Sequence, residues 1–250
     1  MILILALALF LVFCLLLVLT FRTAYYSPAN RKEDPRHIPS SEQYQQVAEG
    51  ILALVDNIAS YPFETVSILS DDGLTLAGRY YHVQDGAPVV IVFHGYRSTA
   101  YRDCAGMFKM LMELGYNVLL PEQVKGIACD CGYTSPRAIM MDVCGKMHLQ
   151  PNLAYFFLRL SARLLGGFDP DERNSLQSLE NSRIPALFVH GEEDMYVPCS
   201  MVYENYDACA AEIKQLLTVP GAGHGLSFLV DEAAYRQTFH SFLQKIGFLP

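Results

Sequence analysis

The segment "NVLLPEQVKGIACDCG", residues 117–132, constrains the fold most strongly, because two apparent strands stand almost next to each other. Residues 118–120 look like the end of a buried strand, and residues 124–131 look like the start of another. About four linking residues reach at most about 14 Å when fully extended, whereas a strand of about five or six residues is itself about 17–20 Å long. Neighbouring parallel strands need a crossover of roughly a dozen residues or more. The two segments therefore cannot both be complete, adjacent parallel strands.

Outside this segment, the chain alternates between apolar strand patterns and helical patterns. Such alternation predicts an α/β fold with a mostly parallel sheet and helices on both faces. The patterns at 64–70 and 74–83 flank a tight turn and are expected to open the sheet as an antiparallel pair. The run "APVVIVFHG", residues 87–95, is typical of a strand buried on both faces. Further strands are expected at 116–120, 126–131, 183–191 and 214–221, and helices at 46–60, 101–115, 200–211 and 233–245.

The segment "NLAYFFLRLSARLLGGFDP", residues 152–170, is unusually aromatic and is expected to form a long apolar helix. It lies between the strands expected at 126–131 and 183–191. One interpretation is a crossover helix that faces the core. The other is part of a lid over a pocket, with a lid region at 153–181. The sequence supports the two interpretations equally.

The first 21 residues contain no charged side chain and are long enough to span about 30 Å of hydrocarbon. A cleaved signal peptide would have a basic start, a shorter apolar core and a small-residue cleavage site. None of these is present, so we expect an uncleaved transmembrane anchor at 1–21, a juxtamembrane linker at 22–43 and an α/β domain at 44–250. Basic residues follow the anchor, which places the domain in the cytoplasm by the positive-inside tendency: Arg22, Arg31, Lys32 and Arg36.

The composition restricts the class of protein. Hydrophobic residues make up 52% and charged residues 18%, which argues against disorder. The net charge of −8 and the lack of a basic stripe argue against nucleic-acid binding. The seven cysteines have no regular spacing and indicate free thiols in a reducing compartment. No cofactor is predicted, and no metal either, because the Cys129-x-Cys131 pair has no matching second pair.

Three polar clusters lie at the ends of expected strands. The first, "FHGYRS" at 93–98, is a loop in which a backbone N–H could stabilise an oxyanion. The second, "HGEEDMYVP" at 190–198, places Asp194 just past a strand, where an acid can orient a histidine. The third, "PGAGHGLSF" at 220–228, sets His224 among glycines that let the backbone bend sharply. Histidine serves as a general base near neutral pH.

The order of these three clusters along the chain resembles that of an α/β-hydrolase, whose triad runs Ser, Asp, His. The resemblance covers about residues 60 to 250 and is strongest to membrane-anchored bacterial proteins of the serine aminopeptidase/monoacylglycerol-lipase type. The segments "DCGYTSP" and "TVPGAGHGLSFLVD" also look like that subgroup. The resemblance implies that Asp194 is the triad acid and His224 the triad base. It also implies that the backbone N–H of Tyr96 forms one half of the oxyanion hole.

The chain departs from this family at the nucleophile. The family carries G-x-S-x-G on a strand-to-helix turn, and no G-x-S-x-G, G-x-C-x-G or G-x-D-x-G occurs here. By alignment with the family pattern, the G-x-S-x-G motif would lie within the short connection near 119–121. Strand–helix units take about 30 residues each, so roughly 70 residues are inferred to be absent. Without the missing strand, the segment 126–131 must pair with the strand at 87–95, or the sheet must divide there.

Other nucleophiles are disfavoured, because none has the strand–turn–helix context of a nucleophile elbow. The alternatives are Ser98, Ser135, Ser200, Ser227, Cys129 and Cys131. The two cysteines fit better as small buried residues than as reactive thiols. The sequence thus predicts a serine-hydrolase relative that is inactive or nearly so towards esters and amides. The alternatives left open are a membrane-tethered binding remnant and an internally deleted gene product.

Overall fold

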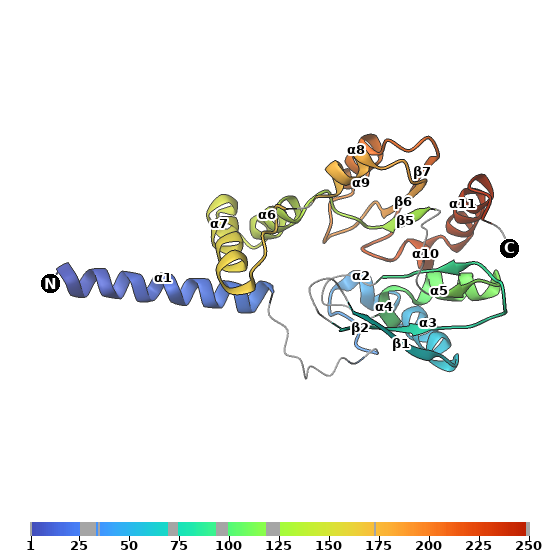
Figure 1. Cartoon of the computed structure of the whole chain (residues 1–250), viewed down its shortest axis with the longest axis horizontal. Coiled ribbons are helices and arrows are strands. Elements are labelled where there is room, and N and C mark those ends of the chain that lie inside the picture. The colour runs from blue at the N-terminus through green and yellow to red at the C-terminus, as the bar shows by residue number, and fades with distance from the viewer. Residues whose placement is uncertain are drawn as a thin grey trace. The chain divides into compact units, whose positions relative to one another are not determined.

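The computed structural model describes residues 2–25, 34, 36–69, 75–93, 100–118, 126–172 and 174–248. The chain divides into two compact units, each built from several stretches of sequence (Figure 1). The first unit comprises Met1–Lys32, Gly132–Ser182 and Tyr196–Ala210, and the second comprises Glu33–Cys131, Arg183–Met195 and Ala211–Pro250.

The described strands all belong to the second unit, and most of them pair in parallel. Strands β1 (Glu64–Leu69) and β2 (Thr75–Tyr80) form an antiparallel pair. Strand β6 (Ala186–Gly191) lies between β5 (Ile127–Asp130) and β7 (Lys214–Val219) in a parallel sheet. The predictions of a mixed α/β fold with a mostly parallel sheet and an antiparallel opening are therefore confirmed.

Strand β6 is the centre of this sheet, and all six of its residues are buried. Its sequence "ALFVHG" is apolar until the last two positions, as expected for a strand with neighbours on both edges. Leu187 and Val189 join a core cluster with Phe108 and Leu111 of α5 (Ala105–Glu113) and Phe242 of α11 (Glu232–Lys245). This cluster fixes the ends of β6 and β7, from which the candidate site is built.

The strand expected at 87–95 is shorter and less buried than predicted. Only Val89–Val90 form a strand, β3, which pairs in parallel with β4 (Asn117–Val118). Val90 and Val92 pack against the core cluster, whereas Phe93 is 81% exposed. The prediction of burial on both faces is wrong for residues 87–93, because only one face of this segment packs against the core. Residues 94–95 lie outside the described residues.

The described strands before and after the short connection at 119–125 belong to different sheets. Among the described strands, β3 and β4 form one sheet, while β5 is hydrogen-bonded to β6 and belongs to another. The sequence allowed two arrangements: the segment 126–131 pairs with the strand at 87–95, or the sheet divides there. Among the described strands, the sheet is divided. The connection at 119–125 lies outside the described residues.

The remaining helices of the second unit are α2 (Glu42–Gln45), α3 (Ala48–Ser60), α4 (Ala100–Asp103) and α10 (Ser227–Val230). The helix expected at 101–115 is interrupted at Cys104 and ends before Gly115. Gly115 has a φ of 82°, the left-handed conformation with which glycine commonly ends a helix.

The first unit consists of helices in the described residues. These are α1 (Ile2–Ala24), α6 (Pro136–Lys146), α7 (Pro151–Ser161), the π-helical turn η1 (Ala162–Gly166), α8 (Ser175–Asn181) and α9 (Ser200–Ala208). Ser135 caps α6, where its side chain accepts a hydrogen bond from the N–H of Ala138. Within the described residues, one helix is long and apolar enough to cross a membrane: Ile4–Ala24, with a mean hydropathy of 3.2.

We expect Leu187→Ala to destabilise the protein by about 2–5 kcal/mol, because it leaves a cavity beneath the central strand. Leu187 is 1% exposed. The matched control is Leu69→Ala on β1, where the leucine is 73% exposed and the cost should stay within about 0.5 kcal/mol. Denaturant unfolding in detergent, followed by circular dichroism, measures both. Equal losses of stability would contradict the assigned core.

Candidate active site

The candidate site lies where the parallel strands β6 and β7 end. Both strands run in the same direction, so the loops that follow them emerge at the same edge of the sheet. Backbone hydrogen bonds join these loops: the N–H of Glu192 donates to Val219 at 3.0 Å, and the N–H of Glu193 donates to Ala222 at 3.0 Å. The acid loop and the histidine loop are therefore held together by the main chain.

Glycines make this close approach of the two loops feasible. A side chain at Gly191 would collide with the backbone carbonyls of Ala222 and Gly223. Gly221 adopts a φ of 75°, in the left-handed region that favours glycine. Gly191 of the acid motif therefore lets the two loops pack backbone to backbone, and Gly221 allows the bend before His224.

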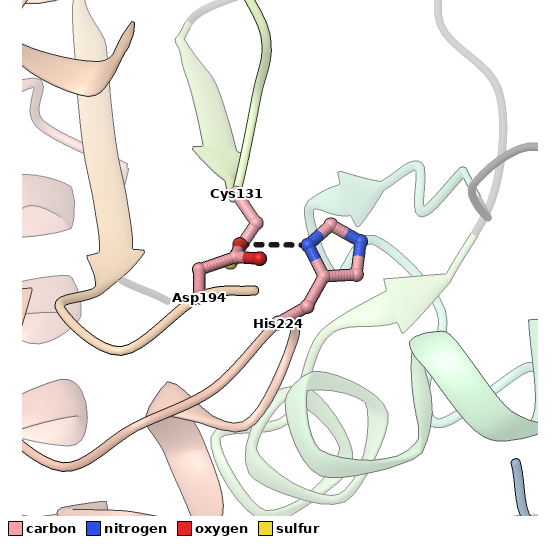
Figure 2. A group of neighbouring side chains, drawn as sticks. All are labelled: Cys131, Asp194 and His224. Carbon is pink, nitrogen blue, oxygen red and sulfur yellow. Dashed lines mark hydrogen bonds and ion pairs between the residues drawn. The ribbon is translucent and has the colours of Figure 1, made fainter. Parts of the chain in front are cut away.

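The structure brings the two predicted site residues together. His224 Nδ1 lies 2.7 Å from Asp194 Oδ2, within hydrogen-bonding distance (Figure 2). The Asp194 side chain is fully buried, and that of His224 is 35% exposed. The main chain of His224 is also held, because the Tyr44 hydroxyl donates to its carbonyl at 3.1 Å. The geometry is that of a carboxylate orienting an imidazole.

A second histidine contacts the same carboxylate. His190 Nε2, at the end of β6, lies 3.2 Å from Asp194 Oδ2, and its side chain is fully buried. One carboxylate oxygen thus faces two imidazoles. In the sequence, His190 stands at the start of the acid motif. Asp194 follows His190 by four residues, just past the end of a strand, and this spacing could have indicated their contact.

The pKa of His224 lies above its ordinary value of 6.5. Burial alone would lower it, but the hydrogen bond and negative charge of Asp194, together with the charges of Asp130 and Asp103, outweigh burial. With Nδ1 directed at Asp194, the other ring nitrogen points away from the carboxylate (Figure 2). This is the orientation in which Nε2 can exchange a proton as a general base.

Behind the His–Asp pair lies a buried polar chain that the sequence analysis did not anticipate. Cys131 follows β5 with a φ of 55°, and its Sγ donates to Asp130 Oδ1 at 3.3 Å. Tyr235 of α11 donates its hydroxyl to Asp130 Oδ2 at 3.2 Å. Burial raises the pKa of Asp130, although both hydrogen bonds oppose this shift. The signal was the acid in "CDC" at a strand end, but its partner Tyr235 is more than a hundred residues away.

Cys131 is unsuited to act as a nucleophile. Burial raises the pKa of its thiol well above the ordinary value, and the charges of Asp130 and Asp194 raise it further. A neutral thiol is a weak nucleophile. It also lies beside the Asp194 carboxylate, where its Sγ accepts a hydrogen bond from the N–H of Gly225 at 3.2 Å (Figure 2).

The Cys131 thiol, the Asp194 carboxylate and the His224 imidazole also form a group that could hold a metal ion. One ligand atom of each lies within 4.8 Å of the others. The His224–Asp194 hydrogen bond already occupies two of these donors, so an ion bound through Nδ1 would displace that bond.

The other candidate residues lie elsewhere. Tyr96 and Ser98 fall outside the described residues. Ser135 and Ser200 belong to the first unit, at the starts of α6 and α9. Cys129 lies within β5 and is partly buried. Ser227 is the first residue of α10, and its hydroxyl is fully buried.

Comparison with known proteins supports the fold. The sequence matches no protein-family model. The uncharacterized protein YqkD of Bacillus subtilis (strain 168) is 29% identical over 95 residues, which are 38% of this chain and 30% of YqkD. An esterase of Pyrococcus furiosus aligns with a TM-score of 0.54 at 16% identity, over 88% of this chain and 99% of its own. The protein DcsB, in complex with a substrate analogue, aligns with a TM-score of 0.53 at 13% identity, over 74% and 99% of the two chains.

These likenesses show that the chain shares the α/β fold of these proteins, in agreement with the fold that the resemblance implied. At such low identity they show the fold alone. The matched stretch of YqkD is less than a third of that protein's length. What this chain does is therefore argued from its own residues.

We expect Asp194→Asn to lower the pKa of His224, because it removes the charge that outweighs burial. The ring resonances of His224, followed by NMR across a pH series, report this shift. Glu193→Gln is the matched control, since it removes the same charge from an exposed neighbour. A pKa of His224 that is unchanged in Asp194→Asn would contradict the assigned pair.

The raised pKa of His224 also predicts the direction of a pH effect on stability. The protonated pair stabilises the folded state fully below about pH 6.5, and this contribution is lost as the pH rises through the higher folded value. The slope of the unfolding free energy in that window should decrease in Asp194→Asn. The raised pKa of Asp130 also makes the stability fall as the pH rises, so unfolding data combine the two groups. The ring resonances of His224 report on His224 alone and are therefore the primary measurement.

Proposed function

We propose that this chain is a membrane-anchored relative of the serine hydrolases that keeps the acid and base of a Ser-Asp-His triad and lacks the nucleophile. The observation that carries the proposal is the 2.7 Å contact between His224 and buried Asp194, in a chain with no G-x-S-x-G sequence. The motif resemblance to the serine aminopeptidase/monoacylglycerol-lipase group and the α/β-hydrolase-like fold support the same descent.

The missing nucleophile is proposed to reflect an internal deletion of roughly 70 residues near 119–121, about two strand–helix units. The divided sheet supports this proposal, because β4 and β5 belong to different sheets among the described strands. The proposed organisation is an anchor at 1–21, a linker at 22–43 and a hydrolase-like domain at 44–250, with a lid region within 153–181. The basic residues after the anchor favour a cytoplasmic domain.

An acid–base pair alone cannot perform acyl transfer by the triad mechanism. His224 would take a proton from a serine hydroxyl, Asp194 would stabilise the resulting imidazolium, and the serine oxygen would attack the carbonyl carbon. Without that oxygen no acyl-enzyme forms. The second oxyanion donor, the N–H after the nucleophile, is absent with it, which leaves at most the N–H of Tyr96. Hydrolysis of esters and amides is therefore expected to be very slow or absent.

A second candidate function is binding without catalysis. The paired and partly exposed His224 next to a buried acid favours it, because such a site can still accept a polar ligand. Selective binding of an ester or amide analogue that survives His224→Ala would support this function.

A third possibility is that the chain is an internally deleted gene product without a stable fold. Cooperative thermal unfolding of the full chain, and an intact reading frame in the genomic DNA around codon 120, would both count against it.

We expect no covalent labelling of the full chain by a fluorophosphonate probe, because this reagent reacts with activated serine hydroxyls. An active serine hydrolase with an intact G-x-S-x-G, labelled in parallel, is the positive control. Labelling that disappears in His224→Ala would overturn the proposal. Labelling that persists in His224→Ala would instead indicate reaction outside the site, and peptide mapping would locate it.

A further inference from the structure

The C-terminal half of α1 is packed against other helices of the first unit. Phe13 lies 5.7 Å from Phe157 of α7 between ring centroids, and Tyr25 stacks edge-on against Phe168 at 5.2 Å. Leu17 is only 6% exposed. The Tyr25 hydroxyl also donates to the sulfur of Met140 on α6 at 3.4 Å. One face of α1, from Phe13 onward, is therefore part of a helical assembly with α6, α7 and η1 (Figure 1).

The N-terminal part of α1 has no such cover. Residues 4–12 are all exposed, and the large apolar side chains among them are between 54% and 73% exposed. Nine helical residues rise about 14 Å, which is roughly half of a hydrocarbon core of about 30 Å. If α1 crosses a bilayer in this packed state, the helices that contact it from Phe13 onward must enter the hydrocarbon with it.

The surface of α7 and η1 is suited to such a position. Leu153, Phe156 and Leu164 are 59%, 53% and 63% exposed, and Leu149 and Leu165 add to them at 49% and 47%. Positions 153 and 156 share one face of α7 by helical spacing, η1 follows directly with Leu164 and Leu165, and Leu149 lies just before α7. We call these five residues the α7 stripe. An exposed apolar patch of this kind marks a surface that contacts a partner or a membrane.

Several polar groups near the α7 stripe are paired within the unit, whereas the Arg163 side chain is 60% exposed and lies 3.8 Å from Asp169. Arg159 forms two hydrogen bonds to Asp169, at 2.8 and 2.7 Å, and contacts Asp171 at 2.9 Å. Tyr155 donates its hydroxyl to Asp171 as well. On α1, Thr20 donates to the carbonyl of Leu16 at 2.6 Å. Polar groups that are satisfied locally cost less to bring towards hydrocarbon than unpaired groups do.

We propose that the α7 stripe inserts into the lipid bilayer together with α1, in the leaflet that holds the C-terminal half of α1. The occupant of this surface is acyl-chain hydrocarbon, because the stripe belongs to helices that pack against α1, and α1 is itself long enough to span a membrane. The proposal rests on the membrane anchoring proposed above for residues 1–21. It goes beyond it by assigning a second, internal segment to the membrane and by giving the proposed lid region a lipid-facing role.

The chain contains no tryptophan, so a single introduced tryptophan is a unique fluorescent reporter. Three variants of the full chain each carry one tryptophan. Phe156→Trp places it on the α7 stripe, Phe10→Trp on the exposed N-terminal part of α1, and Tyr203→Trp on α9. Tyr203 is 46% exposed, close to the 53% of Phe156, so it is the matched control outside the stripe. Each variant is reconstituted in phosphatidylcholine vesicles with either plain or brominated acyl chains. Bromine quenches indole emission on close contact.

We expect brominated chains to quench Phe156→Trp as strongly as Phe10→Trp, with both emission maxima shifted to the blue, and to leave Tyr203→Trp unchanged. Quenching of Phe10→Trp alone would overturn the proposal while preserving the anchor. No quenching in any variant would overturn both. A blue shift of Phe156→Trp without quenching would show that copies of the chain cover the stripe, which also overturns the proposal. Quenching of all three variants would mean unspecific adsorption and would count against it equally.

Discussion

The parallel pairing of β6 with β5 and β7 is the constraint on which the rest of the second unit depends. Because β6 is central and wholly buried, the ends of its two neighbours are fixed relative to it. The loop after β6 supplies Asp194, and the loop after β7 supplies His224. Asp130 is the last residue of β5, and Cys131 follows it. A site assembled from three separate parts of the chain is thus positioned by one short sheet.

The electrostatics of this site follow from burial. Asp194 is fully buried and contacts two imidazoles, which offsets the cost of desolvating its charge. Asp130 lies nearby with hydrogen bonds from Cys131 and Tyr235, and burial raises its pKa. The two acids thus have different partners: Asp194 faces His190 and His224, whereas Asp130 accepts hydrogen bonds from Cys131 and Tyr235.

Part of this arrangement was predictable from the sequence. The alternation of strand and helix patterns along the chain predicted the parallel sheet, because these patterns are local. The pairing of Asp194 with His224 was implied by the resemblance to the α/β-hydrolases. The weak burial of β3 was missed, since an apolar run does not reveal that one face of its strand lacks a covering layer. The Asp130–Tyr235 contact and the packing of Phe13 on Phe157 were missed as well, because each joins segments more than a hundred residues apart.

The central claim is that an acid–base pair persists in a fold from which the nucleophile is absent. Acyl transfer through a covalent intermediate releases the first product in a rapid, stoichiometric burst. Rapid mixing of the full chain with an activated p-nitrophenyl ester tests for that burst most directly. The account predicts no burst and a slow release of p-nitrophenol that His224→Ala hardly changes. A burst close to one equivalent per chain, abolished by His224→Ala, would contradict it.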